Sequence, residues 1–116
     1  MTRSRAVSLW LPVVAWAALI FALSSIPHLS TGLGTWDLIL RKLAHATEYG
    51  ILGALLLRAL GRPALAALAA VAYAASDELH QHFVGGRHAS PLDVAIDAVG
   101  VLAGIAIYRR TRQYHP

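Results

Sequence analysis

Four apolar runs alternate with polar segments along the chain, and the polar residues within the later runs gather toward one end. No charged residue or histidine occurs between Arg5 and His28. Because a hydrocarbon core about 30 Å thick needs about 20 helical residues, this run predicts a membrane-spanning helix. Three further spans are predicted, and two of them begin at a proline, which suits the first turn of a helix. The four predicted spans cover residues 6–26, 42–60, 63–79 and 91–108.

The pattern as a whole predicts an all-α fold, a polytopic membrane bundle of four transmembrane helices in one domain over residues 1–116. The segment 27–36 is rich in Ser, Thr and Gly and is expected to form a loop. The short hinge "RALGRPA" at 58–64 indicates an antiparallel helical hairpin. The first run could instead be a signal peptide with a basic start. We favour a span, because the run is long for a signal peptide and contains Pro12 and Trp16.

Composition supports a membrane protein. Of 116 residues, 57% are hydrophobic and 14% are charged, whereas a soluble domain carries about 25% charged residues. The chain has no cysteine, which excludes a disulfide framework and a thiolate metal site.

The charges are sorted between the two ends of the predicted spans. Seven basic residues fall at the N-terminus, the hinge and the C-terminal tail: Arg3, Arg5, Arg58, Arg62, Arg109, Arg110 and Arg112. Three fall at the opposite end: Arg41, Lys42 and Arg87. All six acids fall in the opposite half: Asp37, Glu48, Asp77, Glu78, Asp93 and Asp97. The positive-inside rule then predicts that both termini are cytoplasmic. The net charge of +4 therefore reflects topology and anionic inner-leaflet lipid, and we expect no nucleic-acid partner.

Helical spacing brings polar residues of three spans to one level. In the second span Lys42, His45 and Tyr49 share a face, with Glu48 three residues after His45. In the third span Tyr73, Asp77, His80 and Gln81 share a stripe, and Glu78 points about 100° away. In the fourth span Asp93 and Asp97 lie on the face of Gly100 and Gly104, a pair that permits close helix approach. These residues predict a polar cavity at the extracytoplasmic ends of the second to fourth helices.

Several kinds of chemistry would fit such a cavity. A divalent cation such as Mg²⁺ could bind to N and O ligands, with His45, Glu48, Asp77, His80 and Asp93 as candidates. The same acids and histidines could act as general acid and base. Lys42 and Arg87 could hold a phosphate, and Ser90 before Pro91 is a good N-cap at a helix start that favours anions. A purely structural cluster that pins the helices together is the competing interpretation.

The motifs "LSSIP" at 23–27, "RKLAHATEYGILG" at 41–53 and "SDELHQHFVGGRHASPLDVAIDAVGVLAG" at 76–104 together resemble the VanZ-like family of small membrane proteins. The resemblance covers nearly the whole chain. It implies a compact helical protein of the bacterial cytoplasmic membrane, linked to the cell envelope and, through founding members, to glycopeptide antibiotic resistance. By motif it extends to Ser24, Ser25, Pro27, Lys42, His45, Asp77, Glu78, His80, Gln81, Arg87, Ser90, Asp93, Gly100 and Gly104. The family pattern often carries an amide at position 97, where this chain has Asp97.

Three functions follow from this interpretation, and the membrane lipid is the expected partner in the first two. The first is an enzyme, a lipid-phosphate hydrolase or transferase, acting on a lipid or a lipid-linked envelope precursor at the outer face. Its catalytic candidates are His45, Asp77, Glu78, His80 and Asp93. Its substrate-binding candidates are Ser24, Ser25, Lys42, Tyr49, Gln81, Arg87 and Ser90, with Glu48 and Asp97 completing the cavity. The second is a non-catalytic module that binds a headgroup, a precursor or a glycopeptide antibiotic. The third is a structural or partner-binding bundle, and an ion relay ranks last.

Overall fold

In the computed structural model, residues 3–24, 35–82 and 91–113 are described, and all the secondary structure in these ranges is α-helical. The helices are α1 (Arg3–Ser24), α2 (Thr35–Leu60), α3 (Pro63–His82) and α4 (Pro91–Gln113). The prediction of an all-α fold with four helices is confirmed. The helices differ most from the predicted spans at two ends, because α2 begins at Thr35 rather than near residue 42 and α4 continues to Gln113 rather than ending near residue 108. Hydropathy identifies only the apolar part of a helix, so a prediction from apolar runs leaves out the polar turns at the two ends.

Residues at the α2–α3 junction explain why the chain turns there. Gly61 adopts a positive φ of 77°, a conformation that glycine reaches without steric cost, and its N–H donates to Leu57 O at 2.8 Å. Pro63 opens α3, and the Ala66 N–H donates to Arg62 O at 3.0 Å. The connection is therefore only two residues long, which makes α2 and α3 an antiparallel hairpin as the sequence predicted.

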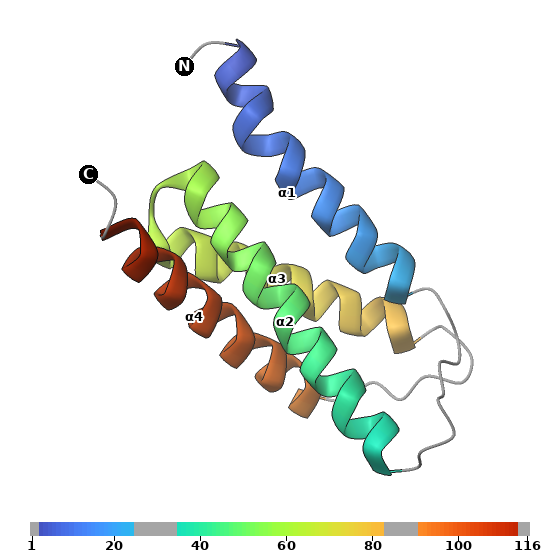
Figure 1. The fold of residues 1–116 in the computed structure, drawn as a ribbon. Helices are drawn as coiled ribbons and strands as arrows, with labels where there is room; N and C mark the ends of the chain where they lie inside the picture. The colour runs from blue at the N-terminus through green and yellow to red at the C-terminus, as the bar shows by residue number, and fades with distance from the viewer. Residues whose placement is uncertain (1–2, 25–34, 83–90, 114–116) are drawn as a thin grey trace.

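α2 is the central helix and packs against α1, α3 and α4 (Figure 1). The start of α1, the end of α4 and the α2–α3 junction lie at one end of a molecule measuring 46 × 28 × 23 Å. The end of α1, the start of α2, the end of α3 and the start of α4 lie at the other end. α2 and α4 consequently run parallel, with α3 antiparallel to both.

The closest contact in the bundle is the crossing of α2 and α4 at their glycines. A Cβ built on Gly104 would overlap the backbone of Gly50, and one on Gly100 would overlap the backbone of Ala46. A Cβ on Gly50 would lie 2.9 Å from Gly100 O. The predicted role of Gly100 and Gly104 is confirmed, and the residues that oppose them are Ala46 and Gly50.

α1 is held to the bundle by side chains that hydrogen-bond to main-chain carbonyls of a neighbouring helix. These bonds are Trp16 Nε1 to Glu48 O at 2.8 Å, Tyr73 OH to Ala17 O at 2.5 Å and Arg58 Nη1 to Ser8 O at 2.9 Å. Each joins α1 to α2 or α3, and together they lie between Ser8 and Ala17 of α1. The buried hydrophobic residues of α3 are the alanines Ala66, Ala70 and Ala74, all fully buried. These small side chains let α3 pack closely.

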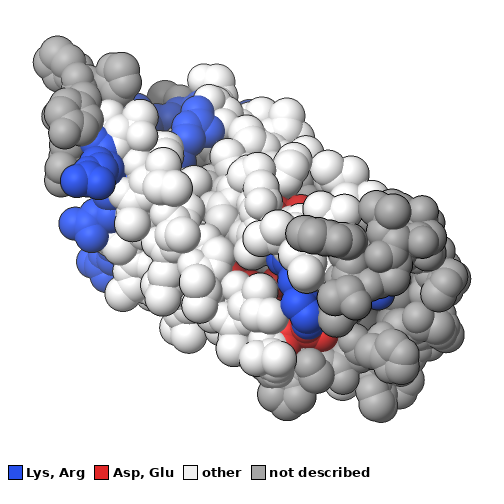
Figure 2. All heavy atoms as spheres, turned by 60° about the horizontal axis from the view of Figure 1, so that its bottom comes forward, with Lys and Arg blue, Asp and Glu red and all other residues white. Residues whose placement is uncertain are grey.

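Much of the molecular surface is apolar. Leu11, Leu68 and Val99, on three different helices, are 62%, 68% and 68% exposed. Figure 2 shows one group of Lys and Arg at one end, and acidic residues with further Lys or Arg beside them toward the other, with an uncharged surface between. Among the described residues, α1 is the helix long and apolar enough to cross a membrane, over Arg3–Leu23. A broad apolar surface of this kind is typical of a protein that faces a partner or lipid.

Candidate functional site

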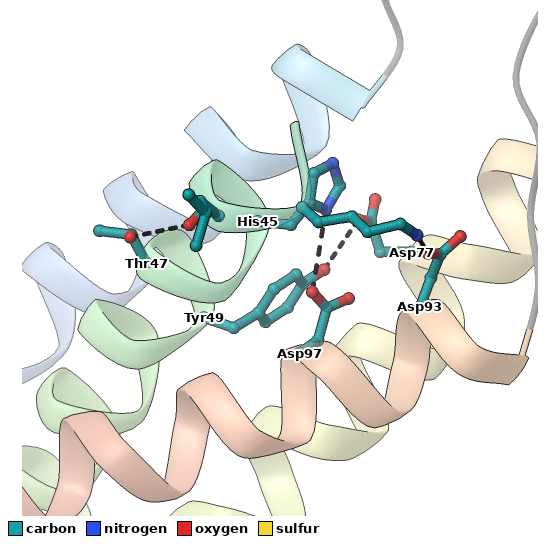
Figure 3. Close-up of polar contacts among 8 residues, drawn as sticks. His45, Thr47, Tyr49, Asp77, Asp93 and Asp97 are labelled. Carbon is teal, nitrogen blue, oxygen red and sulfur yellow. Dashed lines mark hydrogen bonds and ion pairs between the residues drawn. The ribbon is translucent and has the colours of Figure 1, made fainter. Parts of the chain in front are cut away.

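Polar side chains from three helices meet near the end of the bundle opposite the basic termini (Figure 3). α2 contributes one face of its first half, α3 contributes one residue near its end, and α4 contributes the first two turns. The group, called the polar cluster below, consists of Lys42, His45, Tyr49, Asp77, Asp93 and Asp97. The predicted faces of α2 and α4 are therefore the faces that meet, and Asp77 is the residue of α3 that reaches them.

The deepest pair of the polar cluster is Tyr49 and Asp77. Tyr49 is fully buried, Asp77 is 3% exposed, and the Tyr49 hydroxyl donates to Asp77 Oδ2 at 2.8 Å. A buried carboxylate needs hydrogen-bond donors because it has lost its water. This bond joins α2 to α3 and supplies such a donor. Tyr49 was expected to contact substrate, yet its hydroxyl is engaged within the protein.

His45 and Asp97 form the second pair. His45 Nδ1 lies 4.0 Å from Asp97 Oδ1, an ion pair when the imidazole is protonated. Asp97 is 3% exposed, and the His45 side chain is 18% exposed. Figure 3 shows the Asp97 carboxylate directed from α4 toward the His45 ring on α2. A carboxylate beside one ring nitrogen orients an imidazole for proton transfer at the other.

Lys42 and Asp93 form the outer pair. Lys42 Nζ lies 2.5 Å from Asp93 Oδ1, with side chains that are 31% and 23% exposed. Asp93 precedes Asp97 by four residues, or roughly 6 Å along the helix axis. From the deepest pair to the outermost, the three pairs become more exposed. The partner of the carboxylate changes from the neutral hydroxyl of Tyr49 to the charged amine of Lys42. Both Lys42 and Asp93 are close enough to the surface to meet a ligand.

Three other predicted residues lie near the polar cluster but in different surroundings. His80 stacks on Phe21 of α1, with ring centroids 4.4 Å apart. Glu48 is half-buried, and its main-chain carbonyl accepts the Trp16 indole. Glu78 is half-buried on α3, one residue from Asp77. His80 therefore contacts α1 through this ring stack.

The remaining predicted site residues cannot be placed in the same way. Ser25, Arg87 and Ser90 lie outside the described residues, and Ser24 and Gln81 lie in helices whose side chains there are not described. Over the described ranges, no group of three or more His, Asp or Glu side chains has an arrangement that could hold a metal ion.

The predicted site did not include Trp16 or Phe21, and it placed Tyr73 on the polar stripe of the third span without a partner on α1. Trp16, Phe21 and Tyr73 all hydrogen-bond or stack across helices. A signal for two of them was present, because a Trp or Tyr within an apolar run needs an acceptor for its polar atom. The identity of that acceptor was not predictable, since both are main-chain carbonyls.

Comparison with known proteins gives one family. The model of the VanZ/LLP1 family matches residues 2–112, which is nearly the whole chain and includes every residue of the polar cluster. Neither a curated protein nor a solved structure shows significant similarity to this chain.

Proposed function

The chain belongs to the VanZ/LLP1 family of membrane proteins, and from this premise we propose that it is a multi-pass protein of the bacterial cytoplasmic membrane that acts on a phosphate-bearing lipid. The substrate is a lipid or a lipid-linked envelope precursor at the outer face of the membrane. The whole chain forms one membrane domain whose four helices all cross the bilayer, with both termini in the cytoplasm.

The arrangement of charge supports this topology. α1 is able to cross a membrane, and its contacts with α2 and α3 favour a bundle in which those helices cross with it. The basic termini and the basic α2–α3 junction share one end of the molecule. Because basic residues are retained on the cytoplasmic side, that end faces the cytoplasm and the polar cluster lies toward the outside.

The observation that carries the proposal is the His45–Asp97 pair beside Lys42. His45 acts as the general base that takes a proton from water or a hydroxyl group, and Asp97 stabilises the imidazolium that results. Lys42, at the half-exposed rim, attracts the phosphate of the substrate. A carboxylate as buried as Asp97 is costly at membrane depth, which favours a functional reason for its presence.

The test is purified protein in liposomes that contain polyprenyl phosphate or phosphatidic acid, with and without Mg²⁺ or Mn²⁺. Released phosphate and altered lipids are followed by mass spectrometry. We expect turnover by the wild type and its loss in His45→Ala and Asp97→Asn. Ser76→Ala is the matched control, because Ser76 is exposed on α3 and bonds only to Tyr73 O of its own helix among the contacts seen. Turnover unchanged in both cluster variants would refute the assignment.

A second candidate is a non-catalytic module that binds a headgroup, an envelope precursor or a glycopeptide antibiotic. Two pairs favour this alternative, because Lys42 is paired with Asp93 and Asp77 accepts from Tyr49. Side chains paired in this way are suited to holding the helices in place and binding a ligand. Under this alternative the cluster variants lose ligand binding, while prolonged incubation leaves every ligand chemically unchanged. Detection of any altered lipid that requires His45 would exclude the alternative.

A further inference from the structure

A second ligand site is indicated beside the crossing of α2 and α4 and at the basic end of the molecule, and it shares no residue with the polar cluster. Between α2 and α4 lies an open groove of about 520 Å³, called the α2–α4 groove below. Its lining includes Gly50, Ile51, Gly100, Gly104 and Ile107. Gly50, Gly100 and Gly104 also form the crossing of the two helices, so the groove lies beside the place where the two backbones approach most closely.

The lining of the α2–α4 groove offers almost nothing to a polar ligand. Thr47 and Thr111 line it, but their hydroxyls donate to Leu43 O and Ile107 O of their own helices, each at 2.8 Å. Their methyl groups complete an apolar wall. On α4 the lining extends from Gly100 to Thr111, or about 17 Å at 1.5 Å per residue. This is close to the depth of one leaflet of a hydrocarbon core about 30 Å thick.

A basic pocket adjoins the groove. It has a volume of about 490 Å³, and its lining includes Pro63, Tyr108, Arg109 and Arg112. Tyr108 lines both spaces and so joins the apolar groove to the charged pocket. Arg112 is fixed beside it, with Nη1 donating to the Tyr108 hydroxyl at 3.1 Å. The start of α3, at Pro63, and the last turn of α2, at Leu57, both line this pocket. Their dipoles oppose each other, so the positive charge of the pocket comes from the two guanidinium groups.

We propose that this end of the protein binds an anionic phospholipid of the inner leaflet. One acyl chain lies in the α2–α4 groove, and Arg109 and Arg112 hold the phosphate beside Tyr108. Charge complementarity selects this occupant over a second copy of the chain. Copies in one membrane share their orientation, so a copy in the groove would bring its own arginines close to these two. The site is separate from the polar cluster and does not depend on what that cluster does.

The test uses native mass spectrometry of the full-length protein, released from mixed micelles of phosphatidylglycerol and phosphatidylcholine. We expect retained lipid with a preference for phosphatidylglycerol. The double variant Arg109→Gln/Arg112→Gln should lower this preference by roughly 10- to 30-fold, since each arginine that pairs with the phosphate contributes roughly a three- to fivefold step. The control Arg3→Gln/Arg110→Gln removes the same charge from the same end but alters no residue of the basic pocket. Its preference should equal that of the wild type.

A second pair of variants tests the groove. Ala103 is exposed and lines it, so Ala103→Leu should fill the space and lower the retention of both lipids. Ala106 is equally exposed on α4 but does not line the groove, and Ala106→Leu should retain lipid normally. Circular dichroism checks that all variants keep their helices. An equal loss of preference in the two arginine variants, or equal retention in the two alanine variants, would overturn the proposal.

Discussion

At the scale of single residues, the three pairs of the polar cluster handle a buried charge in different ways. Asp77 accepts from the neutral Tyr49 hydroxyl, Asp97 lies beside the titratable His45, and Asp93 is paired with the charged Lys42. A hydrogen bond is electrostatically stronger in a low-dielectric interior, and a missing one is more costly. The consequences of a substitution should therefore grow with depth.

Tyr49→Phe should be the most informative single change for stability. It keeps the ring but removes a donor from the buried carboxylate of Asp77, which should lower the free energy of unfolding by about 1–3 kcal/mol. The measurement is reversible denaturation in SDS and detergent mixtures. Tyr108→Phe is the control, because its hydroxyl accepts only an exposed bond from Arg112, and its effect should stay within about 0.5 kcal/mol. A loss of the same size in both variants would contradict the role assigned to depth.

Exchanging the charges of Lys42 and Asp93 tests whether this pair serves to pack the helices or to bind a ligand. Lys42→Asp and Asp93→Lys each place two like charges together, and the double variant restores opposite charges. Because the side chains are about a third and a quarter exposed, the recovery of stability should be at most about 1 kcal/mol. Lipid binding or turnover should not recover, since the cation is then on α4. A double variant with full activity would show that the pair only holds the helices.

At the scale of the elements, the sequence predicted which face of each helix is buried but not which residue lies opposite which. The 3.6-residue period grouped Lys42, His45 and Tyr49 correctly, because a face depends only on spacing within one helix. It did not match Tyr49 with Asp77, because that contact depends on how α2 and α3 are rotated and shifted. Gly50 was missed for a similar reason, since a glycine within an apolar run gives no sign of the backbone it will meet.

A series of glycine substitutions tests the crossing of α2 and α4. Gly104→Ala and Gly100→Ala would place a methyl group inside the backbone of α2, and neither backbone can move aside cheaply. Gly53→Ala meets atoms at 3.1–3.3 Å, two of them in side chains that can adjust. We expect losses in unfolding free energy of about 1–3 kcal/mol or more for the first two and a smaller loss for the third. The midpoint of thermal unfolding, followed by circular dichroism, gives the order.

A loss in Gly53→Ala as large as that in Gly104→Ala would mean that the two helices are farther apart at the crossing than in the structure.

Gly61→Ala tests the backbone conformation of a glycine rather than its packing. No atom lies within 4 Å of a Cβ built there, so any cost comes from its positive φ alone. That cost should be about 1 kcal/mol.

At the scale of the whole molecule, the two ends differ in charge and in proposed ligand. The end with both termini is basic and adjoins an apolar groove, whereas the opposite end carries the acids in three buried or half-buried pairs. Membership of the family and the pattern of apolar runs made the helices predictable from the sequence. The groove was not predictable, because it is the space left where two particular backbones meet.

The orientation of the chain can be tested with single cysteines, since the sequence contains none. Ser4→Cys and Arg62→Cys mark the basic end, and Ser30→Cys marks the segment between α1 and α2. In intact spheroplasts a membrane-impermeant maleimide should label Ser30→Cys, while Ser4→Cys and Arg62→Cys should react only after lysis. The physical reason is the retention of basic segments in the cytoplasm. Because Arg62→Cys removes a basic residue, Ala64→Cys serves as a charge-neutral control beside it. Labelling of the two basic-end positions before lysis would invert the topology and place the polar cluster at the cytoplasmic face, where an outer-leaflet lipid could not reach it.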